Sequence, residues 1–133
     1  MNKLLKTLLL ILLLTNGVSA VYGGWHMIDK PDGTSLNLPL QYLRYTPFND
    51  YLLPGILLFS MIGMYSIALF AMVMGGAVKY GWLLIIEGVV LSLWIIAQLI
   101  YRIPFSTLHG VFLFISVIFI YTGMLKLRTS ILS

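Results

Sequence analysis

Four long apolar runs, separated by shorter polar segments, dominate the chain. They cover about residues 7–27, 50–76, 80–101 and 107–125. Each has about the 20 residues that an α-helix needs to cross the hydrocarbon core of a bilayer. The last three are joined by connections of a few residues, so consecutive helices must run antiparallel. The pattern predicts an all-α, integral membrane four-helix bundle with up-down-up-down topology, in a single transmembrane domain over residues 1–133.

The first run allows a second interpretation. Lys3 and Lys6 precede a short apolar core, and Val18-Ser19-Ala20 resembles a signal-peptidase site. Retention of the run gives four spans, whereas cleavage would remove residues 1–20 as a signal peptide. We expect retention, with cleavage as the alternative.

The one sizeable polar stretch, residues 23–49, connects the first two runs. Within it, Lys30-Pro31-Asp32-Gly33 is typical of a turn, because proline restricts φ and glycine accepts a left-handed conformation. The stretch also carries more apolar surface than a free loop tolerates. We therefore expect this long loop to lie on the mouth of the bundle or in the headgroup layer. The apolar residues concerned are Leu36, Leu38, Leu40, Tyr42, Leu43 and Tyr45.

The second helix is expected to begin before the hydrocarbon. Thr46-Pro47 is typical of an N-cap followed by proline at the first helical position, and Asp50 in the first turn would face the positive end of the helix dipole. Pro54 would then lie inside the helix, where it cannot donate to the carbonyl of Asp50. This predicts a bend at Pro54, which we interpret as a structural kink.

Several of these residues together resemble a known pattern. Their order is Gly23-Gly24, Asp32-Gly33, Leu36, Leu38-Pro39-Leu40, Thr46-Pro47-Phe48, Asp50-Tyr51-Leu52 and Pro54-Gly55. It resembles a family of small bacterial four-helix membrane proteins. The resemblance is densest over residues 23–59, and beyond them it is a match of hydropathy apart from Trp94 and Gln98. It implies the fold and a bacterial origin, and it implies no activity.

Composition agrees with a membrane protein. Hydrophobic residues make up 60% of the chain and charged residues 9%, with a mean hydropathy of +1.00. Eight basic residues against four acidic ones give a net charge of +4, but the basic residues flank the apolar runs. They form no basic patch, so we expect no nucleic acid among the partners. The absence of cysteine excludes disulfides and thiol catalysis.

The distribution of basic residues predicts the orientation. With four spans, five of them fall on one side and three on the other, and the positive-inside rule places the richer side in the cytoplasm. Both termini are then cytoplasmic, in a bacterial cytoplasmic (inner) membrane. The first group is Lys3, Lys6, Lys79, Lys126 and Arg128, and the second is Lys30, Arg44 and Arg102.

Glu87 is the one acidic residue well inside a predicted span. At 100° per residue, Glu87, Leu91, Trp94 and Gln98 lie along one stripe, which we expect to face the bundle interior. Ionisable residues within a membrane suggest function by default. The structural alternative, which we favour, is a protonated carboxyl that bridges helices.

Hairpin geometry predicts the partners of these polar residues. If the chain turns near Pro104, Gln98 is level with His109 or Gly110, and Glu87 is level with Ile120 or Tyr121. We therefore predict hydrogen bonds between Gln98 and His109 and between Glu87 and Tyr121. Asn16 of the first helix is expected to approach the same interior.

Metal-binding and catalytic motifs have little support in the sequence. Trp25-His26-Met27 could resemble part of a copper(I) site, but methionine is also an ordinary apolar filler. Asp29 and Asp32 are too few for a calcium shell. No nucleotide-binding loop, metalloprotease motif or paired carboxylates are present. We expect no metal, no cofactor and no catalytic residue.

Three functions remain open. The leading one is a non-enzymatic component that associates with itself or with another membrane protein, suggested by glycines suited to helix packing. The second is a small transporter or channel protomer with Glu87 in the pathway. The third is a lipid-modifying enzyme with Glu87, His109 and Tyr121 around an apolar substrate. The glycines are Gly63, Gly75, Gly76, Gly88, Gly110 and Gly123.

Overall fold

The computed structural model describes residues 2–101, 103 and 106–132, and within these residues the regular structure is entirely helical. Two short 3-10 turns, η1 and η2, lie between the first and second long helices. The second long helix consists of three consecutive segments, α2, the π-helix η3 and α3. The elements are α1 (Lys3–Asp29), η1 (Thr34–Leu36), η2 (Leu40–Leu43), α2 (Leu52–Leu57), η3 (Leu58–Met64), α3 (Tyr65–Met74), α4 (Gly81–Ile100) and α5 (Thr107–Leu132).

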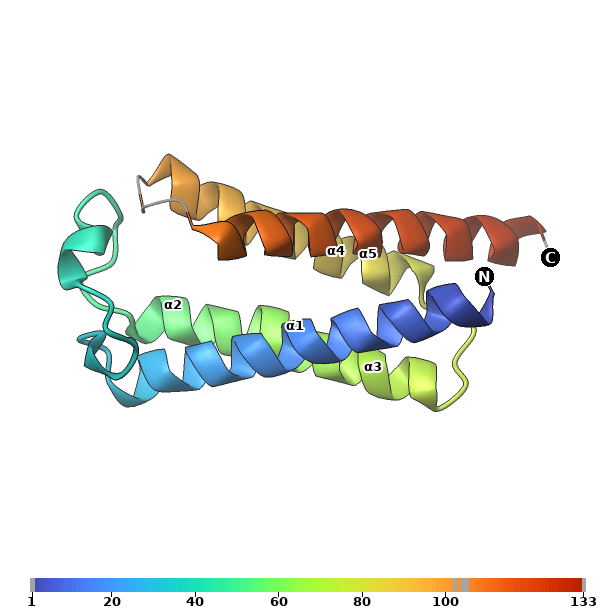
Figure 1. Ribbon diagram of the computed structural model, residues 1–133, viewed down its shortest axis with the longest axis horizontal. Coiled ribbons are helices and arrows are strands. Elements are labelled where there is room, and N and C mark those ends of the chain that lie inside the picture. The colour runs from blue at the N-terminus through green and yellow to red at the C-terminus, as the bar shows by residue number, and fades with distance from the viewer. Residues whose placement is uncertain (1, 102, 104–105, 133) are drawn as a thin grey trace.

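Four helices in the described part of the chain are long and apolar enough to cross a membrane, which indicates a multi-pass membrane protein. They span Lys3–Asp29, Leu52–Met74, Gly81–Ile100 and Thr107–Thr129. All four predicted runs are therefore found, with shifted ends. The largest shift is at the end of α5, which continues to Leu132 and not to residue 125. Because α1 continues to Asp29, the first residues of the predicted loop are helical. Figure 1 shows both chain ends at one end of the molecule and the α1–α2 connection at the other.

The helices pack as two pairs (Figure 1). One pair is formed by α1 with α2, η3 and α3, and the other by α4 with α5. Glycines allow close approach within each pair. A Cβ on Gly24 would lie 2.7 Å from Phe59 N, and a Cβ on Gly88 would lie 2.8 Å from Ser116 O. We refer to the two pairs as the first and second hairpins.

The second helix begins later than predicted. Thr46 Oγ1 accepts a hydrogen bond from Phe48 N (3.1 Å) within a turn, and α2 starts only at Leu52, whose N–H donates to Asp50 Oδ1 (3.0 Å). The predicted N-cap at Thr46, with Pro47 at the first helical position, is therefore wrong. Pro54 lies in the first helical turn, where a missing N–H breaks no helical hydrogen bond. The reason for a bend at Pro54 thus disappears, and the irregularity of this span is η3.

The predicted turn at Lys30-Pro31-Asp32-Gly33 is confirmed. Gly33 has φ +85° and donates its N–H to Lys30 O at 3.0 Å. Asp32 Oδ1 accepts hydrogen bonds from the backbone N–H (3.0 Å) and the hydroxyl (2.7 Å) of Thr34. These two bonds favour the carboxylate and hold the pKa of Asp32 below its ordinary value. A carboxylate therefore closes the turn.

The segment after this turn covers the ends of the helices. Tyr51 donates its hydroxyl to Pro39 O (2.7 Å) and its N–H to Pro31 O (2.8 Å). Burial, and secondarily the neighbouring Tyr42, raises the pKa of the Tyr51 phenol, which keeps it a donor. The expected contact of the loop with the bundle is confirmed for three leucines, whereas Leu40 and Tyr45 are exposed. Leu36, Leu38 and Leu43 form a small core with Met27, Phe48, Tyr51 and Leu58.

Candidate functional site

A buried polar cluster joins the two hairpins halfway along the bundle. Glu87 on α4 is fully buried, and its Oε1 accepts hydrogen bonds from Ser66 Oγ on α3 (2.6 Å) and from Asn16 Nδ2 on α1 (3.2 Å). Asn16 Nδ2 also donates to Ser66 Oγ at 2.8 Å. The expectation that Asn16 approaches the interior near Glu87 is confirmed. We call these three residues the Glu87 cluster.

Sequence reasoning missed Ser66. A signal was present, because Ile62, Ser66, Leu69 and Val73 follow the four-three-four spacing of one helical face, and all four are buried. Ser66 is the polar member of this face. A polar residue on an otherwise apolar interior face is a candidate partner for a buried acid.

The predicted bond between Glu87 and Tyr121 is wrong. Tyr121 is 58% exposed on the outside of α5. The predicted level was right, since a Cβ on Gly88 would lie 2.6 Å from Ile120 Cγ1. The error is one of rotation, because α5 turns Phe119 and Thr122 inward and Tyr121 outward. Hairpin geometry specifies depth, whereas packing specifies which side of a helix faces its partner.

The two carboxyl oxygens of Glu87 differ in their surroundings. Among the described residues, no group forms a hydrogen bond with Glu87 Oε2, although the atom is buried. Both donors to Oε1 are uncharged groups, an amide and a hydroxyl. A buried polar atom without a partner costs stability and marks a position where an additional group could bind.

The second polar pair is confirmed. His109 Nε2 and Gln98 Oε1 lie 2.9 Å apart, and the backbone N–H of Ser106 donates to His109 Nδ1 at 3.0 Å. Because a backbone N–H can only donate, Nδ1 is an acceptor and the ring proton resides on Nε2. His109 is therefore a neutral imidazole that donates to Gln98 Oε1. The bond joins α4 to α5 near their loop-side ends.

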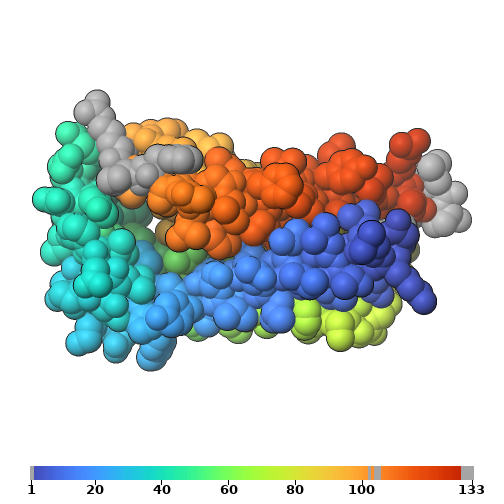
Figure 2. All heavy atoms as spheres, viewed as in Figure 1, coloured from blue at the N-terminus to red at the C-terminus, as the bar shows by residue number. Residues whose placement is uncertain are grey.

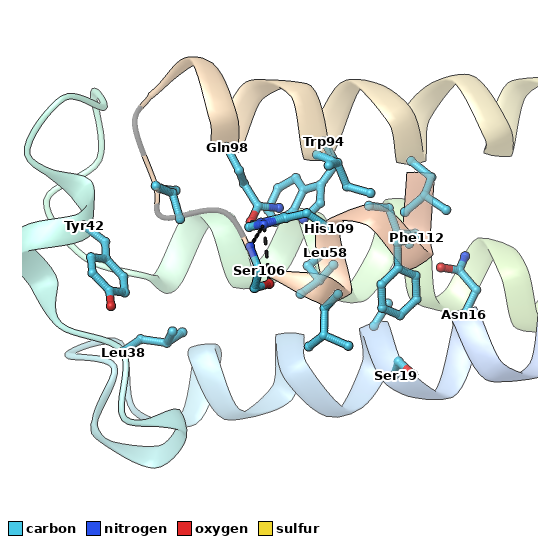
Figure 3. Close-up of a pocket in the computed structure, with 16 residues that line it drawn as sticks. Asn16, Ser19, Leu38, Tyr42, Leu58, Trp94, Gln98, Ser106, His109 and Phe112 are labelled. Atoms are coloured by element: carbon cyan, nitrogen blue, oxygen red, sulfur yellow. Dashed lines mark hydrogen bonds between the residues drawn. The ribbon is translucent and has the colours of Figure 1, made fainter. Parts of the chain in front are cut away.

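A cavity of about 600 Å³ lies between the hairpins, and Figure 3 shows the residues that line it. Leu38 and Tyr42 from the loop lie at one end, and Asn16 lies at the other, with Gln98 and His109 on the wall between them. Most of the lining is apolar. A second cavity of about 280 Å³ shares Leu38, Tyr42 and Gln98 with the first and adjoins it.

The cavity opens toward the loop end. Figure 2 shows the surface hollowed there, between the loop segment, the first turns of α5 and the C-terminal half of α1. Beyond the Glu87 cluster, toward the chain ends, the interior is filled by fully or almost fully buried side chains. These are Leu9, Leu13, Leu69, Val73, Tyr80, Leu84 and Phe119. The cavity is therefore open at one end and closed by packing at the other.

No family model, curated protein or solved structure matches this chain. The resemblance of residues 23–59 to small bacterial membrane proteins stays a prediction.

The Trp25-His26-Met27 segment lies on the last turns of α1. His26 Nδ1 forms a hydrogen bond with Ser35 Oγ, and its ring packs edge-on against Tyr22 with centroids 4.4 Å apart. Within the described ranges, no three His, Cys, Asp or Glu side chains are grouped so that they could hold a metal ion. His26 thus joins α1 to the loop.

Proposed function

We propose that this chain is a non-enzymatic membrane protein that holds one lipid-like molecule between its two hairpins. The cavity carries the proposal. Its volume of about 600 Å³ falls within the ordinary range of ligand pockets, about 300–1,000 Å³. Its walls are mainly apolar, with a few polar groups that could orient a ligand, as in most small-molecule sites. Leu58, Trp94 and Phe112 supply part of the apolar wall.

The proposal includes an orientation. With both chain ends in the cytoplasm of a bacterium, as the positive-inside rule predicts, the open end of the cavity faces the outer side of the cytoplasmic membrane. A lipid of the outer leaflet could then enter beside the loop. Arg102, one of the three basic residues assigned to the outer side, lies outside the described residues. With four spans and both chain ends in the cytoplasm, successive helices would cross the membrane in opposite directions, which is the up-down-up-down topology.

The separation of the polar groups supports binding over catalysis. Glu87 and Gln98 are eleven residues apart on α4, or about 16 Å at 1.5 Å per residue. His109 is bonded to Gln98, so it lies far from the carboxyl of Glu87. Proton transfer between catalytic groups requires hydrogen-bond reach or one bridging water. A lipid-modifying site made of Glu87, His109 and Tyr121 is not supported, because Tyr121 also faces outward.

Retained lipids provide the test. We expect mass spectrometry of the protein extracted in polymer discs to find one enriched lipid species in about equimolar amount. The Ser19→Trp variant should lose that lipid, because Ser19 lines the cavity and an indole would fill it. Val18→Trp is the matched control, since Val18 is 54% exposed and does not line the cavity. Equal lipid retention by both variants would refute the proposal.

The proposal requires residues 1–20 to remain in the mature protein. Asn16 lies within them and bonds both Glu87 and Ser66, so signal-peptide cleavage after Ala20 would remove one third of the Glu87 cluster. We expect peptide mapping of the purified protein by mass spectrometry to recover residues 1–20. A mature chain that begins after Ala20 would contradict this expectation.

The unpartnered oxygen of Glu87 supports a second candidate, a proton-binding role in transport. Intramembrane carboxyls commonly serve proton relays. If Glu87 carries protons, Glu87→Gln should abolish proton flux in proteoliposomes, whereas Ser92→Ala on the same helix should leave it intact. Unchanged flux in Glu87→Gln would remove this role. The packed interior beyond the cluster is why we place binding first.

An accessory or self-associating role remains compatible with lipid binding. However, Gly63, Gly88 and Gly123 make their close contacts within the chain, where a Cβ would lie within 3.0 Å of another helix. They therefore offer less support for association between molecules than the sequence suggested. A stoichiometric protein partner in the same mass spectra would favour the accessory role.

A further inference from the structure

We propose that the side-chain amide of Gln98 recognises the bound molecule by donating a hydrogen bond to an uncharged carbonyl oxygen, such as that of a lipid ester. This inference rests on the proposed lipid-binding function and specifies the chemistry of the ligand. It follows from three features of the cavity: an unused donor on Gln98, the absence of charged side chains from the described part of the lining, and the depth of Gln98 along α4.

The unused donor follows from a chain of hydrogen bonds. The backbone N–H of Ser106 makes His109 Nδ1 an acceptor, so the proton on His109 Nε2 is donated to Gln98 Oε1. The amide oxygen of Gln98 is thus the atom that faces His109. Its Nε2 carries two protons, and no group among the described residues accepts either of them. Gln98 lines both cavities, so these protons are available to a ligand.

The lining favours an uncharged acceptor. None of the described residues around the two cavities is a lysine, arginine, aspartate or glutamate. A phosphate or carboxylate bound there would have no compensating charge from them, and burial of an unpaired charge is costly. A carbonyl oxygen needs only the donor that Gln98 provides. The apolar chain of the ligand would continue along Leu58, Phe112 and Leu91 toward the closed end.

The depth of Gln98 matches the ester region of a bilayer. Gln98 lies two residues before the end of α4 at Ile100, or about 3 Å along the helix axis. The interfacial region lies immediately outside the hydrocarbon core that the helix spans. A lipid with its acyl chain between the hairpins would place its ester carbonyl near this level. Gln98 is therefore at the right depth to bind the ester of a membrane lipid.

Trp94 provides the readout. It lines both cavities, whereas Trp25 and Trp82 are 55% and 62% exposed on the surface. In a Trp25→Phe/Trp82→Phe background, Trp94 fluorescence should be quenched by brominated probes that enter the cavity. Two probes with equal chains isolate the hydrogen bond: methyl dibromostearate carries an ester carbonyl, and dibromooctadecane has no acceptor. One added hydrogen bond corresponds to about a fivefold lower half-saturating concentration for the ester.

Variants at Gln98 test whether its side-chain amide donates the hydrogen bond to the ester carbonyl. We expect Gln98→Met to abolish the preference for the ester while leaving quenching by the alkane unchanged. Gln98→Met/His109→Phe also removes the His109 Nε2 proton, which has no acceptor in the single variant. It replaces both partners of that bond with apolar groups, so it should also lose the preference and provides a second test if Gln98→Met does not fold. Ser92→Ala, at a position that lines neither cavity, should behave like the parent.

Failure of this inference differs from failure of the proposed function. Two results would overturn the role of Gln98 and leave lipid binding intact. One is saturable quenching with the same half-saturating concentration for both probes. The other is an ester preference that survives in both Gln98 variants. Absence of saturable quenching by either probe would overturn lipid binding itself, and the inference with it. Recovery of a retained native lipid without a carbonyl group would also overturn the inference.

Discussion

Replacement of Gly24 by alanine is expected to destabilise the protein by about 1–3 kcal/mol, the usual cost of overpacking a well-packed interface. The added Cβ would lie 2.7 Å from Phe59 N and 2.8 Å from Gly55 O. Both are backbone atoms of the second helix, so the contact cannot be relieved by a change of rotamer. The first hairpin would have to separate, which weakens packing along its length.

Gly23→Ala is the matched control, because the two glycines are adjacent in α1. A Cβ at Gly23 would meet only Leu58 Cδ2, at an ordinary distance of 3.5 Å. Alanine is also the better helix former by about 1 kcal/mol, so this variant should be as stable as the parent or slightly more stable. Thermal unfolding in detergent, followed by size-exclusion chromatography, measures both. Equal stability of the two variants would contradict the close packing of α1 against the second helix.

The second large effect is expected at Glu87. Glu87→Ala should lower stability by about 1–3 kcal/mol, because it leaves the Ser66 hydroxyl and the Asn16 amide without their shared acceptor in a buried site. Glu87→Gln keeps an oxygen that can accept both bonds, so it should retain most of the stability. The comparison can be made by unfolding in mixed micelles, with Trp fluorescence as the signal.

The glutamine variant also tests what the carboxyl does. If the role of Glu87 is structural, stability should decrease from the parent to Glu87→Gln and then to Glu87→Ala. Lipid retention should decrease in the same order. A Glu87→Gln protein that is stable and retains lipid but has lost proton flux would assign Glu87 to transport. If glutamine were as destabilising as alanine, the two donors could not be the main partners of the side chain.

The Glu87 cluster and the cavity both lie between the two hairpins. Most helix packing occurs within each hairpin, and the cluster provides a polar connection between the hairpins. The cavity lies on the loop side of this connection, and the tightly packed core lies on the other side. This arrangement supports a bound molecule that completes the packing of the loop-side half.

Hydropathy and hairpin geometry determined much of this protein. They predicted the four helices, because each must satisfy its backbone hydrogen bonds and bury enough apolar length to cross a bilayer. The conformational preferences of proline and glycine predicted the Asp32-Gly33 turn. Hairpin geometry matched Gln98 with His109, since residues equally far from a tight turn lie at the same depth.

Tertiary structure decided three features that helix depth and composition leave open: the rotation of α5, the start of α2 and the cavity. The rotation of α5, set by its packing on α4, turned Tyr121 outward, and Ser66 on another helix became the partner of Glu87 instead. The start of α2 at Leu52 depends on bonds between Tyr51 and the loop, which local cap preferences at Thr46 could not anticipate. The cavity arises because two closely packed hairpins meet loosely at one end. Packing between segments distant in sequence is a property of the whole arrangement, so no local pattern in the chain specified it.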